Sequence, residues 1–128
     1  MTISPEHNLD YLAAKHAQDL IKAAPDAENT VTKALGVLQE NGVYACFLYL
    51  QAYKKKDEPD HIIRAMLDLL DEDQLGLPKR GNDDVLKYIA DEITGDLHCL
   101  LLAKEALEQM LIYARYGAKA AGKQSDKP

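Results

Sequence analysis

Residues 35–53 read LGVLQENGVYACFLYLQAY, two apolar segments with helical spacing that meet at Asn41-Gly42. Glycine adopts positive φ angles without steric cost, so Gly42 is typical of a position that ends a helix. The stretch therefore predicts two helices joined by a tight turn. Because the second segment is apolar nearly all round, we expect neighbouring helices or a partner subunit to cover most of its circumference.

Composition favours helix over strand along the whole chain. Ala, Leu, Lys, Glu and Asp are common among the 128 residues, while Val, Thr and Phe are sparse. A chain of this length fits one domain with one core. We therefore expect an all-α fold, a compact single-domain bundle of five to six helices over residues 1–122, followed by a flexible C-terminal tail over residues 123–128.

Apolar periodicity and helix-capping residues set the expected boundaries. Residues 75–82 contain two Gly and one Pro, and they predict the longest irregular connection. Asp96 is a suitable N-cap for the last helix. The helices are expected at about 5–24, from 27 or 30 to 40, at 43–56, from 58 to 70 or 73, at 83–93 and from 97 onward.

The sequence also bears on location and redox state. No apolar run approaches the ~20 residues needed to cross a membrane, and the N-terminus MTISPEH lacks the basic and apolar regions of a signal peptide. We therefore expect a cytoplasmic protein without membrane contact. Cys46 and Cys99 each lie in an apolar helical segment, so buried free thiols are favoured over a disulfide.

Catalytic signals are weak. His98 and Cys99 are adjacent, so on a helix their side chains point about 100° apart and do not form a nucleophile-base pair. His7, His16 and His61 show no metal-ligand spacing. We expect no enzymatic activity, no catalytic residues, no metal, no cofactor and no small-molecule substrate.

The formal net charge of −6 has the wrong sign for a protein that contacts nucleic acid over its whole surface, so any contact must be local. Lys104, Arg115, Lys119 and Lys123 fall within about 100° of one another on the last helix. Such a stripe can follow a phosphate backbone. Spacing alone nevertheless favours an ordinary solvated face helped by the helix dipole.

Other cations give weaker signals of the same kind. Two lie seven residues apart in the first helix, one lies in the second helix, three end the third helix, and Lys79 and Arg80 lie in the 75–82 connection. Tyrosines can stack on bases, but their positions in apolar stripes favour packing. The candidate RNA-binding residues are Lys15, Lys22, Lys33, Lys54, Lys55, Lys56, Lys104, Arg115 and Lys119.

Two segments resemble one known family. Residues 33–50 combine a helix, an Asn-Gly turn and an apolar helix, and the last helix carries Glu105-Ala106-Leu107 followed by Arg115-Tyr116. Over roughly residues 8–120, the chain resembles the small subunit of the type III-B CRISPR effector, the Cmr complex. It differs at Gln39, where the family often has a basic residue, and at Ile112, where the family often has Trp.

The resemblance implies a non-catalytic structural subunit of an RNA-guided ribonucleoprotein in antiviral defence. The expected partners are other CRISPR effector subunits, copies of the chain itself, crRNA and target RNA. The copies would stack along the complex and contact RNA phosphates without sequence specificity, while other subunits cleave RNA. Two alternatives remain open: a helical adaptor that binds only protein, with residues 35–53 as its docking face, and the small subunit of a related type III-A effector.

Overall fold

Six α-helices account for most of residues 5–53 and 57–125, the parts of the chain that the computed structural model describes. No strand occurs in these ranges, so the predicted all-α class is confirmed. A 3-10 turn, Asp73–Leu75, and a π-helical segment, Ile89–Ile93, complete the regular structure. The helices are α1 (Pro5–Ala23), α2 (Glu28–Asn41), α3 (Val43–Ala52), α4 (Asp57–Leu70), α5 (Val85–Tyr88) and α6 (Leu97–Ser125).

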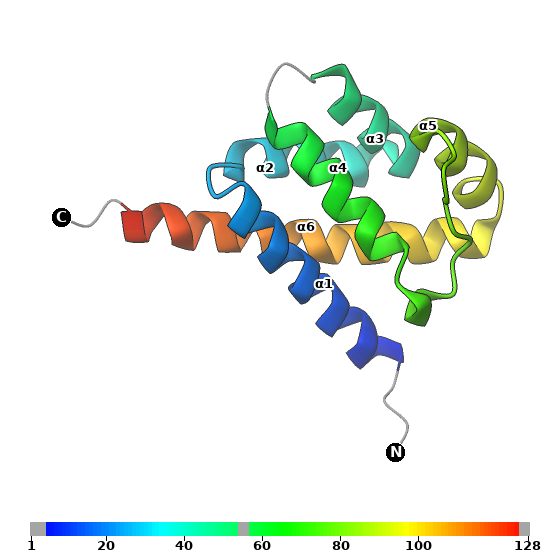
Figure 1. The fold of residues 1–128 in the computed structure, drawn as a ribbon, viewed down its shortest axis with the longest axis horizontal. Coiled ribbons are helices and arrows are strands. Elements are labelled where there is room, and N and C mark those ends of the chain that lie inside the picture. Colours follow the sequence, from blue (N-terminus) through cyan, green and yellow to red (C-terminus); the bar gives the residue numbers. More distant parts are fainter. Residues whose placement is uncertain (1–4, 54–56, 126–128) are drawn as a thin grey trace.

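The long helix α6 organises the bundle. Helices α1 and α2 both pack along it, and α4 packs on α1 and α3. Figure 1 shows α1 and α4 crossing in front of α6, with the C-terminal end of α6 extending past the other helices. That end therefore has fewer neighbours within the chain than the rest of the helix.

The core is built from the apolar stripe that each long helix turns inward, as the sequence periodicity predicts. Within the described residues, no buried side-chain nitrogen or oxygen lacks a hydrogen-bond partner. The interior is thus apolar with its few polar atoms satisfied. Its largest side chains include Leu20, Leu38, Phe47, Leu50, Ile62, Met66, Leu69, Tyr88 and Leu107.

Gly42 forms the predicted turn between α2 and α3. Its φ is +98°, its N–H donates to the Leu38 carbonyl at 3.0 Å, and its carbonyl accepts from the Cys46 N–H at 3.1 Å. One glycine therefore ends α2 and begins α3. The predicted helical hairpin is confirmed.

Helix α3 is shorter than predicted, and the chain itself covers it only in part. It ends at Ala52 rather than near residue 56, and Lys54, Lys55 and Lys56 lie outside the described residues. Its buried residues contact α2, α4 and α5, whereas Tyr44 and Leu48 are exposed. The chain itself therefore covers only one side of this apolar helix.

The expected helix over 83–93 is only partly α-helical. Asp84 caps α5 by accepting a hydrogen bond from the Lys87 N–H at 3.2 Å, and four residues later the helix widens into the π-helical segment. There the Thr94 N–H donates to the Ile89 carbonyl, five residues back, at 2.8 Å. A Cβ at Gly95 would lie 2.7 Å from the Asp91 carbonyl oxygen, so the chain can leave this widened turn only because residue 95 is glycine.

Helix α6 begins as predicted and ends later than predicted. The Asp96 carboxylate accepts from the Cys99 N–H at 3.1 Å, which confirms the N-cap. The helix continues to Ser125, so its last three residues belong to the segment predicted as a tail. Alanines at 118, 120 and 121 are strong helix formers, and they outweigh the cost of Gly122. Residues 126–128 lie outside the described part of the chain.

Candidate nucleic-acid interface

The last helix places two of its predicted cations fully on the surface. Arg115 and Lys119 lie one turn apart on α6, and both are exposed. Lys104 is half-buried, and Glu108 lies on the same side between it and Arg115, about 40° from Lys104 at 100° per residue. The predicted stripe is therefore interrupted by a carboxylate. We call Arg115 and Lys119 the α6 basic surface; the side chain of Lys123 lies outside the described part.

An aromatic ring adjoins the α6 basic surface. The guanidinium carbon of Arg115 lies 5.8 Å from the centroid of the Tyr116 ring, near the outer limit for a cation–π contact. Tyr116 is 62% exposed. A cation and an open aromatic ring in neighbouring positions are the two groups with which proteins contact a nucleic-acid strand, through phosphates and through stacked bases.

The cations of α1 and α2 do not join the α6 basic surface. Lys15 lies 3.7 Å from the Glu72 carboxylate. Lys22 lines the groove between α1 and α6, as does Gly117, which is roughly opposite Arg115 around the axis of α6. Lys33 borders a separate cavity between α2, α3 and α4. The three lysines thus face different neighbours, and the structure does not gather them into one patch.

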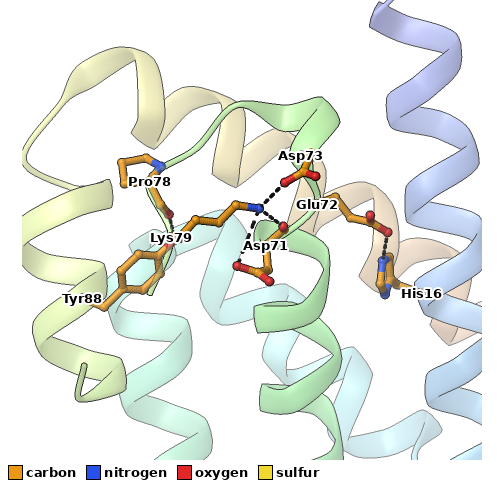
Figure 2. Close-up of polar contacts among 7 residues, drawn as sticks. All are labelled: His16, Asp71, Glu72, Asp73, Pro78, Lys79 and Tyr88. Atoms are coloured by element: carbon orange, nitrogen blue, oxygen red, sulfur yellow. Dashed lines mark hydrogen bonds and ion pairs between the residues drawn. The ribbon is translucent and has the colours of Figure 1, made fainter. Parts of the chain in front are cut away.

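The two cations of the loop after α4 bind to residues close to them in sequence, as Figure 2 shows for Lys79. The Lys79 ammonium lies 2.8 Å from an Asp73 carboxylate oxygen and 3.8 Å from one of Asp71, and it also donates to the Asp71 carbonyl. The hydrogen bond from Lys79 lowers the pKa of Asp73, and the same bond raises the pKa of Lys79. Arg80 donates to the Asp83 carbonyl at 2.7 Å. Carboxylates and carbonyls therefore compete with any phosphate for this loop.

A contact that the sequence did not predict ties α1 to the end of α4. His16 is only 8% exposed, as its place in the apolar stripe predicts, and its Nε2 lies 2.6 Å from Glu72 Oε2 (Figure 2). The two residues are 56 positions apart, so no local pattern links them. The contact satisfies a buried ring nitrogen and fixes the position of the loop that follows α4.

The thiols differ in environment. Cys46 is buried and donates to the Ala34 carbonyl at 3.4 Å, and burial raises its pKa to about 12. Such a thiol is not ionised near neutral pH and is a poor nucleophile. Cys99 is half-buried rather than buried, and neither cysteine forms a disulfide.

Three further findings concern the class of protein. In the described ranges, no three His, Cys, Asp or Glu side chains are arranged so that they would hold a metal ion. No described helix is both long and apolar enough to cross a membrane. Comparison with models of protein families, with curated proteins and with solved structures finds no match.

Proposed function

We propose that this protein is a non-catalytic structural subunit of an RNA-guided ribonucleoprotein, of the kind formed by the type III-B CRISPR effector. In this role it contacts RNA phosphates through the α6 basic surface, without sequence specificity, and it contacts other subunits through exposed apolar side chains. The observation that carries the proposal is the exposure of Arg115 and Lys119, one turn apart and beside Tyr116, on an otherwise acidic chain.

The position of this surface on α6 supports an RNA contact. Arg115 and Lys119 are exposed on the side of α6 that faces away from α1, because Gly117, roughly opposite Arg115, lines the groove between α1 and α6. The resemblance to the Cmr small subunit adds that family's own basic-aromatic pair at Arg115-Tyr116.

Exposed apolar side chains support a role inside an assembly. Leu97 and Leu101, one turn apart at the start of α6, are 70% and 58% exposed, and Tyr44 and Leu48 are exposed one turn apart on α3. Apolar pairs of this kind favour protein contacts. The same observation favours the second candidate, a helical adaptor that binds only protein, so the two proposals differ in the α6 basic surface.

The test is a double charge reversal, Arg115→Glu with Lys119→Glu. Both side chains are exposed, so we expect an unchanged helical circular dichroism spectrum and a decrease of at most ~1–2 kcal/mol in the free energy of unfolding. Incorporation into the ribonucleoprotein, or retention of target RNA by it, should fall. The slope of log affinity against log salt concentration should decrease in magnitude by about 0.7–0.9 for each phosphate that the variant no longer binds. Co-purification with the other subunits and the guide across a salt series measures both effects.

A matched control separates local contact from overall charge. Arg64 and Lys87 are exposed cations on α4 and α5, so Arg64→Glu with Lys87→Glu changes the net charge by the same amount. This control variant should assemble and retain RNA like the parent. Equal losses in both double variants would show that only net charge matters. Parent-like behaviour of the Arg115→Glu, Lys119→Glu variant at every salt concentration would favour the adaptor.

A further inference from the structure

A cavity of about 420 Å³ lies between α2, α3 and α4. Small-molecule sites in proteins have volumes of roughly 300–1,000 Å³ and combine apolar walls with a few polar groups. This cavity has both features. Its lining residues are Thr30 and Lys33 from α2, Tyr49, Leu50 and Ala52 from α3, Tyr53 directly after α3, and Pro59 from α4.

Two aromatic rings form one wall of the cavity. The ring centroids of Tyr49 and Tyr53 lie 4.8 Å apart, with the planes tilted by 47°. The two rings therefore contact each other. Tyr53 is 60% exposed, so much of its surface remains available to a planar ligand. Aromatic side chains of this kind stack on nucleobases without regard to sequence.

The α2 side of the cavity supplies charge and hydrogen-bonding groups. Lys33 is exposed at the cavity, and no carboxylate lies within ion-pairing distance of it among the described residues. Thr30 donates to the Glu58 carboxylate at 2.9 Å, which holds an acceptor next to the wall that Thr30 forms. A cation and aromatic rings around one cavity suit a ligand that carries both an anionic group and a planar ring.

We propose that this cavity binds a purine nucleotide, with its base stacked on Tyr53 and its phosphate beside Lys33. An adenine or guanine base supplies a large planar ring to stack on Tyr53, and the phosphate supplies the negative charge. The inference goes beyond the proposed function, because a nucleotide can occupy the cavity without any other subunit. The same chemistry can come from a free nucleotide or from one nucleotide of an RNA strand.

The experiment titrates the isolated chain with adenosine 5′-monophosphate, adenosine and inorganic phosphate, monitored by calorimetry and by chemical-shift changes. Adenosine monophosphate should bind with a Kd on the order of 1 mM or tighter, adenosine more weakly, and inorganic phosphate weakest of the three. Tyr53→Ala should weaken nucleotide binding about tenfold, since the base no longer has a ring to stack on. Tyr53→Phe should retain binding, because the ring remains. Lys33→Gln should reduce the affinity for the monophosphate to that for adenosine.

An exposed tyrosine and an exposed lysine outside the cavity provide matched controls. Tyr44 is an exposed tyrosine on α3 that does not line the cavity, and Lys87 is an exposed lysine on α5. Tyr44→Ala and Lys87→Gln should leave the affinity unchanged. Thermal melting of every variant shows whether a loss of binding reflects a loss of folded protein.

A second set of titrations separates the two sources of the ligand. A free-nucleotide site binds the monophosphate at least as tightly as a six-nucleotide oligoadenylate, whereas a strand-binding site prefers the oligonucleotide. In either case, Tyr53→Ala should weaken the binding of whichever ligand the parent protein prefers. The proposal is overturned if neither ligand binds at millimolar concentration, or if Tyr53→Ala and Lys33→Gln bind like the parent. Either result leaves the proposed subunit function intact, because that function is tested in the assembled complex.

Discussion

Gly42 adopts φ +98°, a backbone conformation that residues with side chains rarely occupy, and no heavy atom lies within 4 Å of the place where a Cβ would stand. The effect of a substitution there thus comes from the backbone alone. We expect Gly42→Ala to lower the free energy of unfolding by about 1–3 kcal/mol. Gly36, inside α2 with equally open space, is the matched control: Gly36→Ala should raise it by about 0.5–1 kcal/mol. Thermal denaturation measures both, and equal midpoints for the two variants would contradict the strain argument.

Cys46 makes stability depend on pH above the normal thiol range. Its pKa rises from 9.0 to about 12 on burial, so between these values the unfolded chain loses the proton and the folded chain keeps it. Below about pH 9 the thiol is protonated in both states, and the free energy of unfolding does not change through this group. Between about pH 9 and 12 the free energy of unfolding falls by up to ~1.4 kcal/mol per pH unit. Denaturant unfolding at several pH values should therefore show a shallower alkaline loss for Cys46→Ala than for the parent. Tyr49 and Tyr88 titrate in both proteins, so parallel curves would show that the thiol is not responsible.

At the scale of the helices, periodicity predicted well wherever a helix packs one face on the core. The α2–α3 hairpin follows from Asn41-Gly42, and the start of α6 follows from Asp96. Residues 89–93 are helical as predicted, but apolar spacing does not reveal that they form a π-helical turn, which depends on where the following chain passes. For α3 the sequence left open whether neighbouring helices or a partner subunit cover it, and within the chain its outer side carries exposed Tyr44 and Leu48. Composition shows that a helix is apolar, and the fold decides which side is covered.

The contact between His16 and Glu72 joins α1 to the loop after α4 and should contribute measurably to stability. Glu72→Ala leaves the buried His16 ring nitrogen without its partner, which should lower the free energy of unfolding by about 1–3 kcal/mol. Glu72→Gln keeps a side chain of the same shape that can still bond to the ring, so its effect should be smaller. Urea denaturation of the two variants measures the difference. Identical decreases would mean that the bond to His16 does not matter.

At the scale of the whole molecule, the sequence predicted part of the candidate interface. The exposure of Arg115 and Lys119 follows from helix geometry, since both lie off the apolar stripe of α6. The neighbours of Lys15 and Lys22 could not be predicted, because Glu72 and Gly117 approach them only through the packing of α1 against α4 and α6. Local helical angles thus identify surface cations, and tertiary packing decides which of them remain available to a phosphate.

Net charge opposes RNA binding by the isolated chain. The formal charge is −6, and exposed acids surround the loop after α4 and the region before α6: Asp68, Asp71, Asp73, Asp83, Asp84, Asp91, Glu92 and Asp96. At low ionic strength the Debye length of ~30 Å lets these charges repel a strand that approaches the α6 basic surface. At physiological salt the repulsion is screened, but so is the attraction to two exposed cations.

We therefore expect the free chain to bind single-stranded RNA with a Kd weaker than ~1 μM at every salt concentration, while the assembled complex retains RNA. Filter binding from low to physiological salt measures the free chain, and the assembled complex is the positive control. The Arg64→Glu, Lys87→Glu variant should bind more weakly still at low salt and like the parent at high salt, because only long-range repulsion changes. Sub-micromolar affinity of the free chain would mean that local contacts outweigh the field of the whole molecule, and that RNA binding does not depend on neighbouring subunits.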